Sequence, residues 1–388
     1  MTGRPHICVV STTALIVHFF LKPHLRALAE TCDVTLALNP ENDAYTPPLS
    51  LPVSFTSIDI KRPIAPYHDF LALFQLFRLF RRKRVDLVWT VAPKAGLLGM
   101  VAALLAGVPA RVFIFQGEVW ASRRGLLRWL LKTADRVTAA CATHILAVSE
   151  SERVFLEAEG VVPQGRVKVF GAGSIGGVDL DRFRPNPEAR AVVRAELSIP
   201  QDATLALFVG RLTADKGIFE LAEVFGKIAS DQPDLWLLWV GPDEEKAASK
   251  IKSLMGCGAV RSRFVGFTGS PERYMAASDF ICLPSRREGF AMVIVEAAAT
   301  GLPAIGSRIY GISDTVADEK TGLLYDGGDS RQLAEAIIRL ASDTKFRMHL
   351  AAAARARAVE HFSQSEVVGR YRDFLCGLAS LAARTTQD

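Results

Sequence analysis

Short runs of β-branched and other apolar residues alternate with helical patterns along the whole chain, and this alternation occurs twice. The first half is expected to contain six strands, at 6–10, 34–38, 85–90, 111–115, 144–148 and 167–170. The second half is expected to contain six more, at 205–209, 236–240, 263–265, 279–283, 303–306 and 322–325. Strands that alternate with helices pair in parallel, so the pattern predicts two Rossmann-like α/β domains with helices on both faces of each sheet.

A proline-rich, turn-forming stretch near the middle of the chain marks the expected domain boundary. We expect a first domain over 1–178, a linker over 179–200 and a second domain over 201–362. The remaining 363–388 is expected to form a last helix, which either caps the second domain or returns to the first. A chain of 388 residues has enough material for two cores of common size.

The composition, with 49% hydrophobic and 22% charged residues, is that of an ordered globular protein. The six cysteines form no C-x-x-C pair, so we expect reduced thiols in a cytosolic protein. The seven histidines form no zinc-ligand pattern, and no metal or other cofactor is expected. No uninterrupted apolar run approaches the ~20 residues that span a bilayer.

Two glutamates, Glu288 and Glu296, follow the strand expected at 279–283. Glu288 lies in a loop at the carboxyl edge of the sheet, where open α/β folds bind ligands, and Glu296 lies more than a turn into the next helix. The amides of Phe290 and Ala291 at the helix start would face an anion. The two carboxylates would then reach different parts of one extended ligand, which suits a nucleotide-sugar.

Two cations are predicted at the same edge of the second sheet. Arg211 follows the strand expected at 205–209, and Lys216 precedes the next helix. Positive charges beside a helix amino end would neutralise a diphosphate leaving group as a glycosidic bond breaks. Glu288 and Glu296 could instead be the acid and base of a glycosidase, but the cations favour a phosphate-bearing donor.

These motifs resemble the donor domain of the retaining glycosyltransferases of family 4, which have the GT-B fold of two Rossmann-like domains facing across a cleft. The resemblance rests on Val209-Gly210-Arg211-Leu212 with Lys216-Gly217, on Val265-Gly266-Phe267, and on Glu288-Gly289-Phe290 with Glu296. It implies that Arg211 and Lys216 hold the donor diphosphate, Glu296 the ribose and Glu288 the donor sugar. Gly289, Phe290 and Ala291 would surround sugar and phosphate, and Gly266 and Phe267 would lie near the base.

The first half is similar to bacterial members that act on polyprenyl-diphosphate-linked glycans. The resemblance implies that Thr12 and Thr13 approach the reaction centre, and it places Lys94, Gln116 and Glu118 among the candidates for acceptor or cleft contacts. Many family members carry a histidine at the position of Gln116. A glutamine cannot titrate, so Glu118 is the nearest possible replacement, although an exposed loop carboxylate without function is as good an interpretation.

The excess positive charge lies in the first half. Residues 1–178 hold 20 Lys and Arg against 13 Asp and Glu, which suggests an anionic partner. In the stretch 119–132, Arg124, Arg128 and Lys132 recur every four residues, and Trp120 and Trp129 suit a headgroup boundary, so a helix lying on an anionic membrane and an ordinary sheet-covering helix are both possible. The stretch 70–80 is apolar nearly all round, which favours burial.

The sequence thus predicts a retaining hexosyltransferase acting at the cytoplasmic face of the membrane, peripherally bound. It would move a hexose or N-acetylhexosamine from a nucleoside diphosphate sugar, a UDP-sugar by preference, to a lipid-linked saccharide. No nucleic-acid-binding motif is present. The alternatives are a nucleotide-sugar epimerase of the same fold and a non-catalytic two-lobed sugar-binding protein. Asp179-Leu180-Asp181 matches a metal-binding D-x-D pattern but is interpreted as linker.

Overall fold

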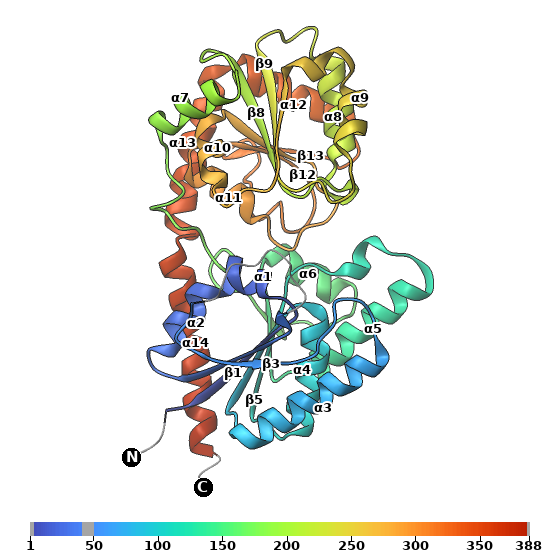
Figure 1. Ribbon diagram of the computed structural model, residues 1–388, viewed down its shortest axis with the longest axis vertical. Coiled ribbons are helices and arrows are strands. Elements are labelled where there is room, and N and C mark those ends of the chain that lie inside the picture. The colour runs from blue at the N-terminus through green and yellow to red at the C-terminus, as the bar shows by residue number, and fades with distance from the viewer. Residues whose placement is uncertain (1–3, 41–49, 386–388) are drawn as a thin grey trace. The chain divides into compact units, whose positions relative to one another are not determined.

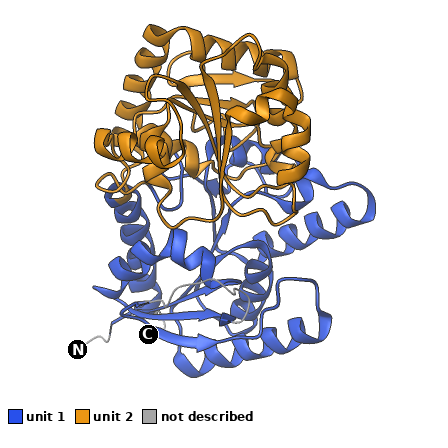
Figure 2. Cartoon of the chain, turned by 45° about the horizontal axis from the view of Figure 1, so that its top comes forward, with its two compact units in different colours: residues 1–177, 365–388 blue, residues 178–364 orange. Residues whose placement is uncertain are grey.

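The computed structural model describes residues 4–40 and 50–385, which form two compact units. Unit 1 comprises residues 1–177 and 365–388, and unit 2 comprises residues 178–364 (Figure 2). Each unit is built around one parallel sheet, of seven strands in unit 1 and six in unit 2, which confirms the predicted pair of Rossmann-like domains.

In unit 1 the strands lie in the order β3-β2-β1-β4-β5-β6-β7. The strands are β1 (His6–Ser11), β2 (Asp33–Leu38), β3 (Ser54–Ser57), β4 (Leu87–Val91), β5 (Ala110–Phe115), β6 (His144–Ala147) and β7 (Val167–Lys168). The helices are α1 (Ala14–Ile16), a π-helical turn (Val17–Leu21), α2 (Lys22–Ala29), α3 (Pro66–Lys83), α4 (Pro93–Leu105), a 3-10 turn (Val119–Ser122), α5 (Gly125–Cys141), α6 (Glu150–Ala158) and α14 (Gln364–Thr385). Helices α3, α4 and α5 lie on one side of this sheet, and α2 and α14 lie on the other (Figure 1).

In unit 2 the strand order is β10-β9-β8-β11-β12-β13. The strands are β8 (Thr204–Val209), β9 (Leu235–Val240), β10 (Ser262–Val265), β11 (Phe280–Leu283), β12 (Ala304–Ser307) and β13 (Gly322–Tyr325). The helices are α7 (Pro187–Glu196), a 3-10 turn (Ala214–Lys216), α8 (Ile218–Ile228), α9 (Ala248–Met255), a 3-10 turn (Gly256–Arg261), α10 (Pro271–Ala277), α11 (Met292–Ala299), α12 (Ser330–Ser342) and α13 (Thr344–His361).

Local sequence signals explain where many of these helices begin. Proline occupies the first turn of α3, α4, α7 and α10, where its fixed φ suits a helix and its missing N–H costs no intrahelical hydrogen bond. Side chains cap other helices: Ser149 accepts a hydrogen bond from the Glu152 amide at 3.1 Å, and Asp343 accepts one from the Phe346 amide at 2.9 Å. Strand β4 is buried at every residue, as expected for a central strand covered on both faces.

The strand β3 was not predicted. Its sequence, Ser-Phe-Thr-Ser, is short and largely exposed, and it pairs only with β2 at the edge of the sheet. A strand of this kind lacks the apolar run that marks a buried strand, because only its backbone hydrogen bonds hold it in the sheet. The other strands lie within a few residues of their predicted ranges.

The stretch predicted as a linker, 179–200, contains α7, which is part of unit 2. The Arg194 side chain on α7 is fully buried, and its guanidinium donates to Asp279 Oδ2 at 2.8 Å and to the Ala203 carbonyl at 2.7 Å. Asp279 also accepts from the Leu205 amide at 2.7 Å. A buried arginine requires such a complete set of acceptors, so these bonds fix α7 to the starts of β8 and β11.

The last helix belongs to unit 1. On α14, Tyr371 stacks against Trp89 of β4 with ring centroids 6.0 Å apart and packs edge-on against His24 of α2 at 5.1 Å. Its hydroxyl donates to the Ser174 carbonyl at 3.2 Å. These buried aromatic contacts place α14 against the sheet of unit 1, which is one of the two positions expected for it from the sequence.

Candidate functional site

The candidate site of unit 2 lies where the strand order of its sheet reverses. The chain proceeds from β8 outward to β9 and β10 on one side, and from β11 outward to β12 and β13 on the other. The loops after β8 and β11 therefore leave adjacent strands in opposite directions, which creates a crevice at the carboxyl edge of the sheet. These loops, 210–217 and 284–291, carry most of the predicted donor residues.

Lys216 and Glu288 form a direct ion pair across this edge. Lys216 Nζ lies 2.6 Å from Glu288 Oε1, and the two side chains are only 18% and 13% exposed. Partial burial strengthens the charge interaction relative to a surface pair and makes an unpaired charge costly. The structure thus brings together two predicted site residues that are 72 positions apart in the chain.

Backbone contacts hold the two loops in register. The Arg286 amide donates to the Asp215 carbonyl at 2.8 Å. Gly217 has a φ of +70°, and a Cβ at this position would lie 2.0 Å from the Pro284 carbonyl oxygen. Only glycine allows the backbone to pack this closely in a left-handed conformation, so Gly217 is required to place Lys216 beside Glu288.

The loop after β12 supports the Glu288 turn from its other side. A Cβ on Gly311 would lie 2.5 Å from the Gly289 carbonyl oxygen, and the Gly311 carbonyl accepts the Ala291 amide at 3.0 Å. The prediction that the Ala291 amide is free for an anion is therefore wrong. Helix α11 begins one residue later, and its start offers the amides of Phe290 and Val293, which have no acceptor within the described part of the chain.

Arg211 lies near Lys216 but makes different contacts. Its side chain is 48% exposed and lies 3.3 Å from Glu244 Oε2, in the loop after β9. Burial opposes ionisation of the nearby Asp215, yet the Thr213 hydroxyl together with the charges of Lys216, Arg211 and Arg287 lowers the pKa of Asp215. Three cations therefore act on one carboxylate at this edge, and the local field favours a further anion.

Glu296 is the most unusual acidic group of unit 2. It lies on α11 and is partly exposed, and no described residue donates a hydrogen bond to its carboxyl group. Burial raises the pKa of Glu296 to about 7; Arg182 lowers it and Glu272 raises it further. A carboxyl group without a donor from the protein is an unfilled acceptor, so it suits the paired hydroxyls of a ribose.

Gly266 and Phe267 follow β10, two strands from β8 at the same edge of the sheet. The Gly266 carbonyl accepts a hydrogen bond from the Gly241 amide at 3.2 Å, which ties this loop to the end of β9. Phe267 is 60% exposed. An exposed aromatic ring at a ligand-binding edge is available to stack on a planar base.

The candidate residues of unit 1 also follow strands at a point where the order reverses, here between β1 and β4. Thr12 and Thr13 follow β1 and are buried, and the Thr13 hydroxyl caps α1 by accepting the Ile16 amide at 3.4 Å. Lys94, in the first turn of α4, lies 2.6 Å from Asp69 Oδ1 of α3. The structure therefore gathers these three residues at one edge but engages Lys94 in an internal ion pair.

Glu118 is buried, not an exposed loop carboxylate. It is 1% exposed and faces Glu152 of α6, which is fully buried and accepts the Val148 amide at 2.9 Å and the Gly117 amide. Burial, and then the charge of Glu118, raise the pKa of Glu152 well above its ordinary value. The two carboxyl groups are expected to share a proton, and Glu152 holds the turn that carries Gln116.

The side-chain amide nitrogen of Gln116 is buried and has no hydrogen-bond acceptor within residues 4–40 and 50–385. Buried amides are almost always paired, so this nitrogen is suited to an acceptor group supplied by a ligand. Its neighbour Glu118 points instead toward Glu152. Of the two residues considered for the place of the family's histidine, Glu118 is engaged with another carboxyl group and Gln116 keeps an unpaired amide nitrogen.

Three residues near the site, Arg287, Arg182 and Glu272, were not among those predicted from the sequence. Arg287 directly precedes Glu288 and adds to the positive field at Asp215, a role that its position in Arg286-Arg287-Glu288 could have indicated. Arg182 donates to Glu272 Oε2 at 2.8 Å, and both affect Glu296. The Asp179 carboxylate of the D-x-D segment accepts the Asp181 and Arg182 amides, each at 3.1 Å, and so forms the turn that places Arg182. Arg182 and Glu296 are far apart in the sequence, so no motif spacing could have predicted that one affects the other.

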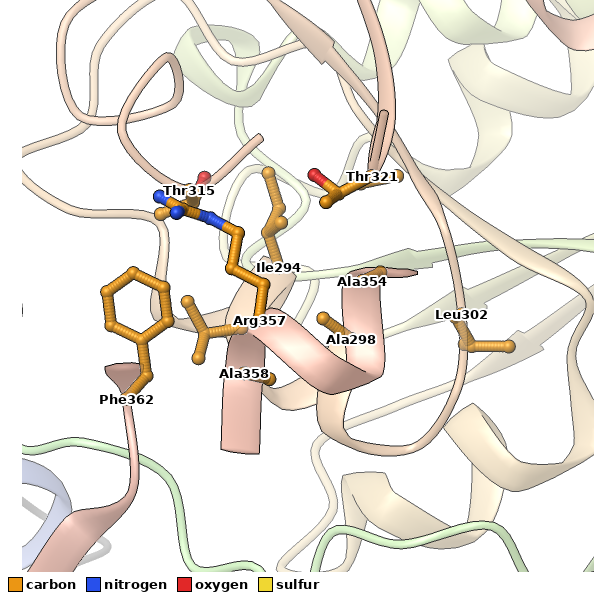
Figure 3. Close-up of a pocket in the computed structure, with 11 residues that line it drawn as sticks. Ile294, Ala298, Leu302, Thr315, Thr321, Ala354, Arg357, Ala358 and Phe362 are labelled. Atoms are coloured by element: carbon orange, nitrogen blue, oxygen red, sulfur yellow. The ribbon is translucent and has the colours of Figure 1, made fainter. Parts of the chain in front are cut away.

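A separate gap lies behind α11, away from the loops described above. Figure 3 shows it between α11 and α13, lined mainly by apolar side chains together with Arg357, Thr315 and Thr321. Its volume of about 10 Å³ holds at most one water molecule. The gap is a packing defect between two helices and is too small for a sugar or a nucleotide.

Two of the three cations of the basic stripe predicted around 119–132 pack against the protein, whereas Arg124 is exposed. Arg128 and Lys132 bind Glu159 at 2.7 and 2.6 Å, and both lie over the Trp120 ring, which is buried. The prediction that Trp120 meets a headgroup boundary is therefore wrong. The outward face of α5 is apolar instead, with Leu126, Trp129 and Leu130 exposed by 78%, 61% and 49%.

The stretch 70–80 is also less buried than expected, because Phe70 and Phe74 of α3 are 68% and 48% exposed. Among the described helices, none is both long and apolar enough to cross a bilayer.

Each of the two units matches a known protein family. Residues 190–357 match the family described as "Glycosyl transferases group 1", and residues 24–173 match the "Glycosyl transferase 4-like domain". The chain belongs to the glycosyltransferases. The match to the second family falls within unit 1 and the match to the first within unit 2, which confirms the resemblance found in the sequence.

Two curated relatives match most of the length of this glycosyltransferase. It is 28% identical over 323 residues to the capsular polysaccharide biosynthesis glycosyltransferase CapM of Staphylococcus aureus, with 82% of this chain and 84% of the relative covered. It is 28% identical over 286 residues to an Escherichia coli UDP-Gal:alpha-D-GlcNAc-diphosphoundecaprenol alpha-1,3-galactosyltransferase, with 73% of each chain covered.

Solved structures confirm the fold. Anabaena Alr3699/HepE in complex with UDP superimposes with a TM-score of 0.78 at 18% identity, covering 96% of this glycosyltransferase and all of that chain. Sucrose-phosphate synthase from Thermosynechococcus elongatus gives a TM-score of 0.81 at 22% identity, covering 97% and 100%. At these identities the similarity establishes the GT-B architecture alone.

Proposed function

We propose that this glycosyltransferase moves a hexose or N-acetylhexosamine from a UDP-sugar to a lipid-linked saccharide, with retention of anomeric configuration. The observation that carries the proposal is the Lys216–Glu288 ion pair at the reversal point of the unit 2 sheet, with the unpartnered Glu296 on the helix that follows. Cations, a helix start and two acidic groups at one edge match the parts of a nucleoside diphosphate sugar.

The residues are assigned to the donor from one end to the other. Phe267 stacks on the base, and Glu296 accepts hydrogen bonds from the ribose hydroxyls. Arg211 and Lys216, with the amides at the start of α11, hold the diphosphate. Glu288 accepts from hydroxyls of the donor sugar. Lys216 is already paired with Glu288, so a bound donor inserts its charged phosphate beside a preorganised cation whose position needs little adjustment.

In the proposed reaction the bond between the anomeric carbon and the diphosphate oxygen breaks, and Arg211 and Lys216 stabilise the negative charge that develops. The acceptor hydroxyl attacks the same face of the sugar, and its proton passes to the leaving phosphate. This front-face route requires no protein base, which is consistent with a glutamine at position 116. The unpaired Gln116 amide would instead hold an oxygen of the acceptor.

Two relatives support the choice of substrates. The E. coli galactosyltransferase is named for a UDP-linked donor and a diphosphoundecaprenol-linked acceptor, and the Anabaena protein was crystallised with UDP. A donor of the same class and a lipid-linked acceptor at the cytoplasmic face of the membrane follow by analogy. The proposal leaves the identity of the sugar to experiment.

The outward faces of α3 and α5 are proposed to bind the membrane that holds the acceptor. Leu126, Trp129 and Leu130 form one apolar stripe on α5, and the exposed Arg123 and Arg124 adjoin it, a combination that suits an anionic lipid surface. Sedimentation with vesicles containing anionic lipid should carry down the wild type and leave Trp129→Glu in solution. The Met348→Glu variant, which alters an exposed residue of unit 2, serves as control, and equal sedimentation of all three would contradict the membrane assignment.

The transfer itself is tested with a panel of UDP- and GDP-sugars and a polyprenyl-diphosphate GlcNAc acceptor. We expect a glycosylated lipid product whose new linkage has the anomeric configuration of the donor, determined by NMR. Conversion of the donor sugar without acceptor would favour the epimerase. Binding of the donor without any product would favour the two-lobed binding protein.

A further inference from the structure

Two cysteines that are 344 residues apart in the chain meet on the surface of unit 1. Cys32 lies between α2 and β2, and Cys376 lies on α14. The Cys32 thiol donates a hydrogen bond to Cys376 Sγ at 3.4 Å, and the Thr31 hydroxyl lies 3.3 Å from the same sulfur. This close approach of two thiols was not predicted, because only the return of α14 to unit 1 brings these parts of the chain together.

The two thiols differ in accessibility and in pKa. Cys32 is 2% exposed, whereas Cys376 is partly exposed. Hydrogen bonding by the Cys32 thiol, with further contributions from Thr31 and Arg372, lowers the pKa of Cys376 to about 6, although burial opposes this shift. The hydrogen bond to Cys376 and burial raise the pKa of Cys32. Cys376 is thus the accessible nucleophile and Cys32 the protected partner, the asymmetry expected of an attacking and a resolving thiol.

We propose that Cys32 and Cys376 form a reversible disulfide that fastens α14 to unit 1 when the chain meets a low-molecular-weight disulfide such as oxidised glutathione. The Cys376 thiolate attacks one sulfur of the oxidant, whose S–S bond breaks and releases one glutathione thiolate. Cys32 then loses its proton to solvent and attacks the Cys376 sulfur, which releases the second glutathione. One disulfide is consumed, one is formed, and two protein thiols are oxidised.

The bond would act on the segment that carries the chain from unit 2 back into unit 1. Helix α14 is otherwise held by noncovalent contacts such as the packing of Tyr371 against Trp89. A disulfide that closes a loop of this length restricts the unfolded chain strongly. Oxidation should therefore raise the midpoint of thermal unfolding and protect α14 from proteolysis, independently of any nucleotide-sugar.

The experiment treats the full-length protein with oxidised glutathione and maps peptides by mass spectrometry without reduction. The wild type should give a linked peptide containing Cys32 and Cys376, together with a higher unfolding midpoint that dithiothreitol reverses. Cys257→Ser removes an exposed cysteine of unit 2 and should behave like the wild type. Cys376→Ser should give no linked peptide.

The Cys32→Ser variant separates the two steps, because it retains the nucleophile without its partner. It should accumulate a stable mixed disulfide of glutathione on Cys376. If the serine variant folds poorly, Cys32→Ala should accumulate the same adduct more slowly, because alanine provides no hydrogen bond to Cys376. A wild type that keeps glutathione on Cys376, or that leaves Cys376 unmodified under conditions that modify Cys257, would overturn the proposal. None of these measurements depends on transferase activity, so their failure is distinct from a failure of the proposed function.

Discussion

Lys216 Nζ lies 2.6 Å from Glu288 Oε1, and the two residues stand on loops that leave adjacent strands of one sheet. Each side chain orients the other before a ligand arrives, because a half-buried charge without its partner would be poorly solvated. The pair is therefore both a part of the fold and the centre of the proposed donor site.

Replacing either member of this pair should reduce turnover far more than stability. We expect Lys216→Ala and Glu288→Gln each to lower kcat by about 10²-fold, as loss of a preorganised charged contact does. The double variant should lose less than the product of the two single effects, since both changes disrupt one interaction. Transfer of radiolabelled sugar gives the rates, and circular dichroism melting checks the fold; additive losses would indicate that the residues act separately.

Glu296 should make nucleotide binding depend on pH. Burial raises its pKa to about 7, and an ionised carboxylate accepts ribose hydroxyls better than a carboxylic acid does, so UDP affinity should increase as the pH rises through this value. Glu296→Gln should bind UDP more weakly and retain only the pH dependence of UDP itself. Calorimetric titration of both proteins over the same pH series makes the comparison.

Glu296 should also make folding stability depend on pH, with stability falling over the range in which UDP affinity rises. The pKa of Glu296 is higher in the folded chain than its ordinary value of 4.5, so the folded state loses stability as the pH rises from 4.5 to about 7. Glu296→Gln should therefore unfold at a higher temperature than the wild type above neutral pH while binding UDP less well. A variant that loses both stability and affinity would point to a structural role alone.

Gly217 tests whether the close approach of the two loops positions the site. Gly217→Ala places a Cβ against the Pro284 carbonyl and imposes a left-handed φ on alanine, which by itself costs about 1 kcal/mol or more. Gly328→Ala is the matched control, because Gly328 has a φ of +91° but open space around it. Gly217→Ala should reduce kcat and unfold at lower urea concentration than Gly328→Ala; equal behaviour would show that the contact with Pro284 is unimportant.

Much of the architecture could be predicted because buried parallel strands leave a simple signal. The strands β4 and β8 are almost entirely apolar, and the loops after such strands must meet at one edge of the sheet. This is why the roles proposed for Lys216 and Glu288 could be placed on neighbouring loops from sequence alone. Their direct ion pair could not be predicted, since it depends on the few ångströms by which Gly217 approaches Pro284.

The wrong predictions concern features that tertiary packing decides and that the sequence pattern leaves open. A helix with regularly spaced cations can turn them inward or outward, and Glu159 together with the Trp120 ring draws Arg128 and Lys132 inward. The amide of Ala291 is occupied because a distant loop, at Gly311, supplies a carbonyl group. Glu159 and Gly311 are both far in sequence from the residues that they contact. Such contacts cannot be predicted from the local sequence.

The buried pair of Glu118 and Glu152 should make the stability of unit 1 decrease as the pH rises above the ordinary pKa of a glutamate. Burial and the charge of Glu118 raise the pKa of Glu152, so stability should decrease as the pH rises above the ordinary value of 4.5. Tyr371 also lies within the field of Glu152 and, with its own pKa raised by burial, stays neutral. Glu118→Gln should weaken this pH dependence, as measured by urea unfolding across a pH series; an unchanged slope would place the titrating group elsewhere.

The most direct test of the donor site is a calorimetric titration of the wild type, Arg211→Ala and Arg339→Ala with UDP. Arg211 and Arg339 are similarly exposed arginines of unit 2, each paired with a glutamate, but only Arg211 lies at the edge where β8 and β11 end. We expect the wild type and Arg339→Ala to bind UDP alike and Arg211→Ala to bind about 10-fold or more weakly, the cost of a lost charged hydrogen bond. Equal affinity in all three proteins, or no binding of UDP by the wild type, would contradict a diphosphate site at this edge.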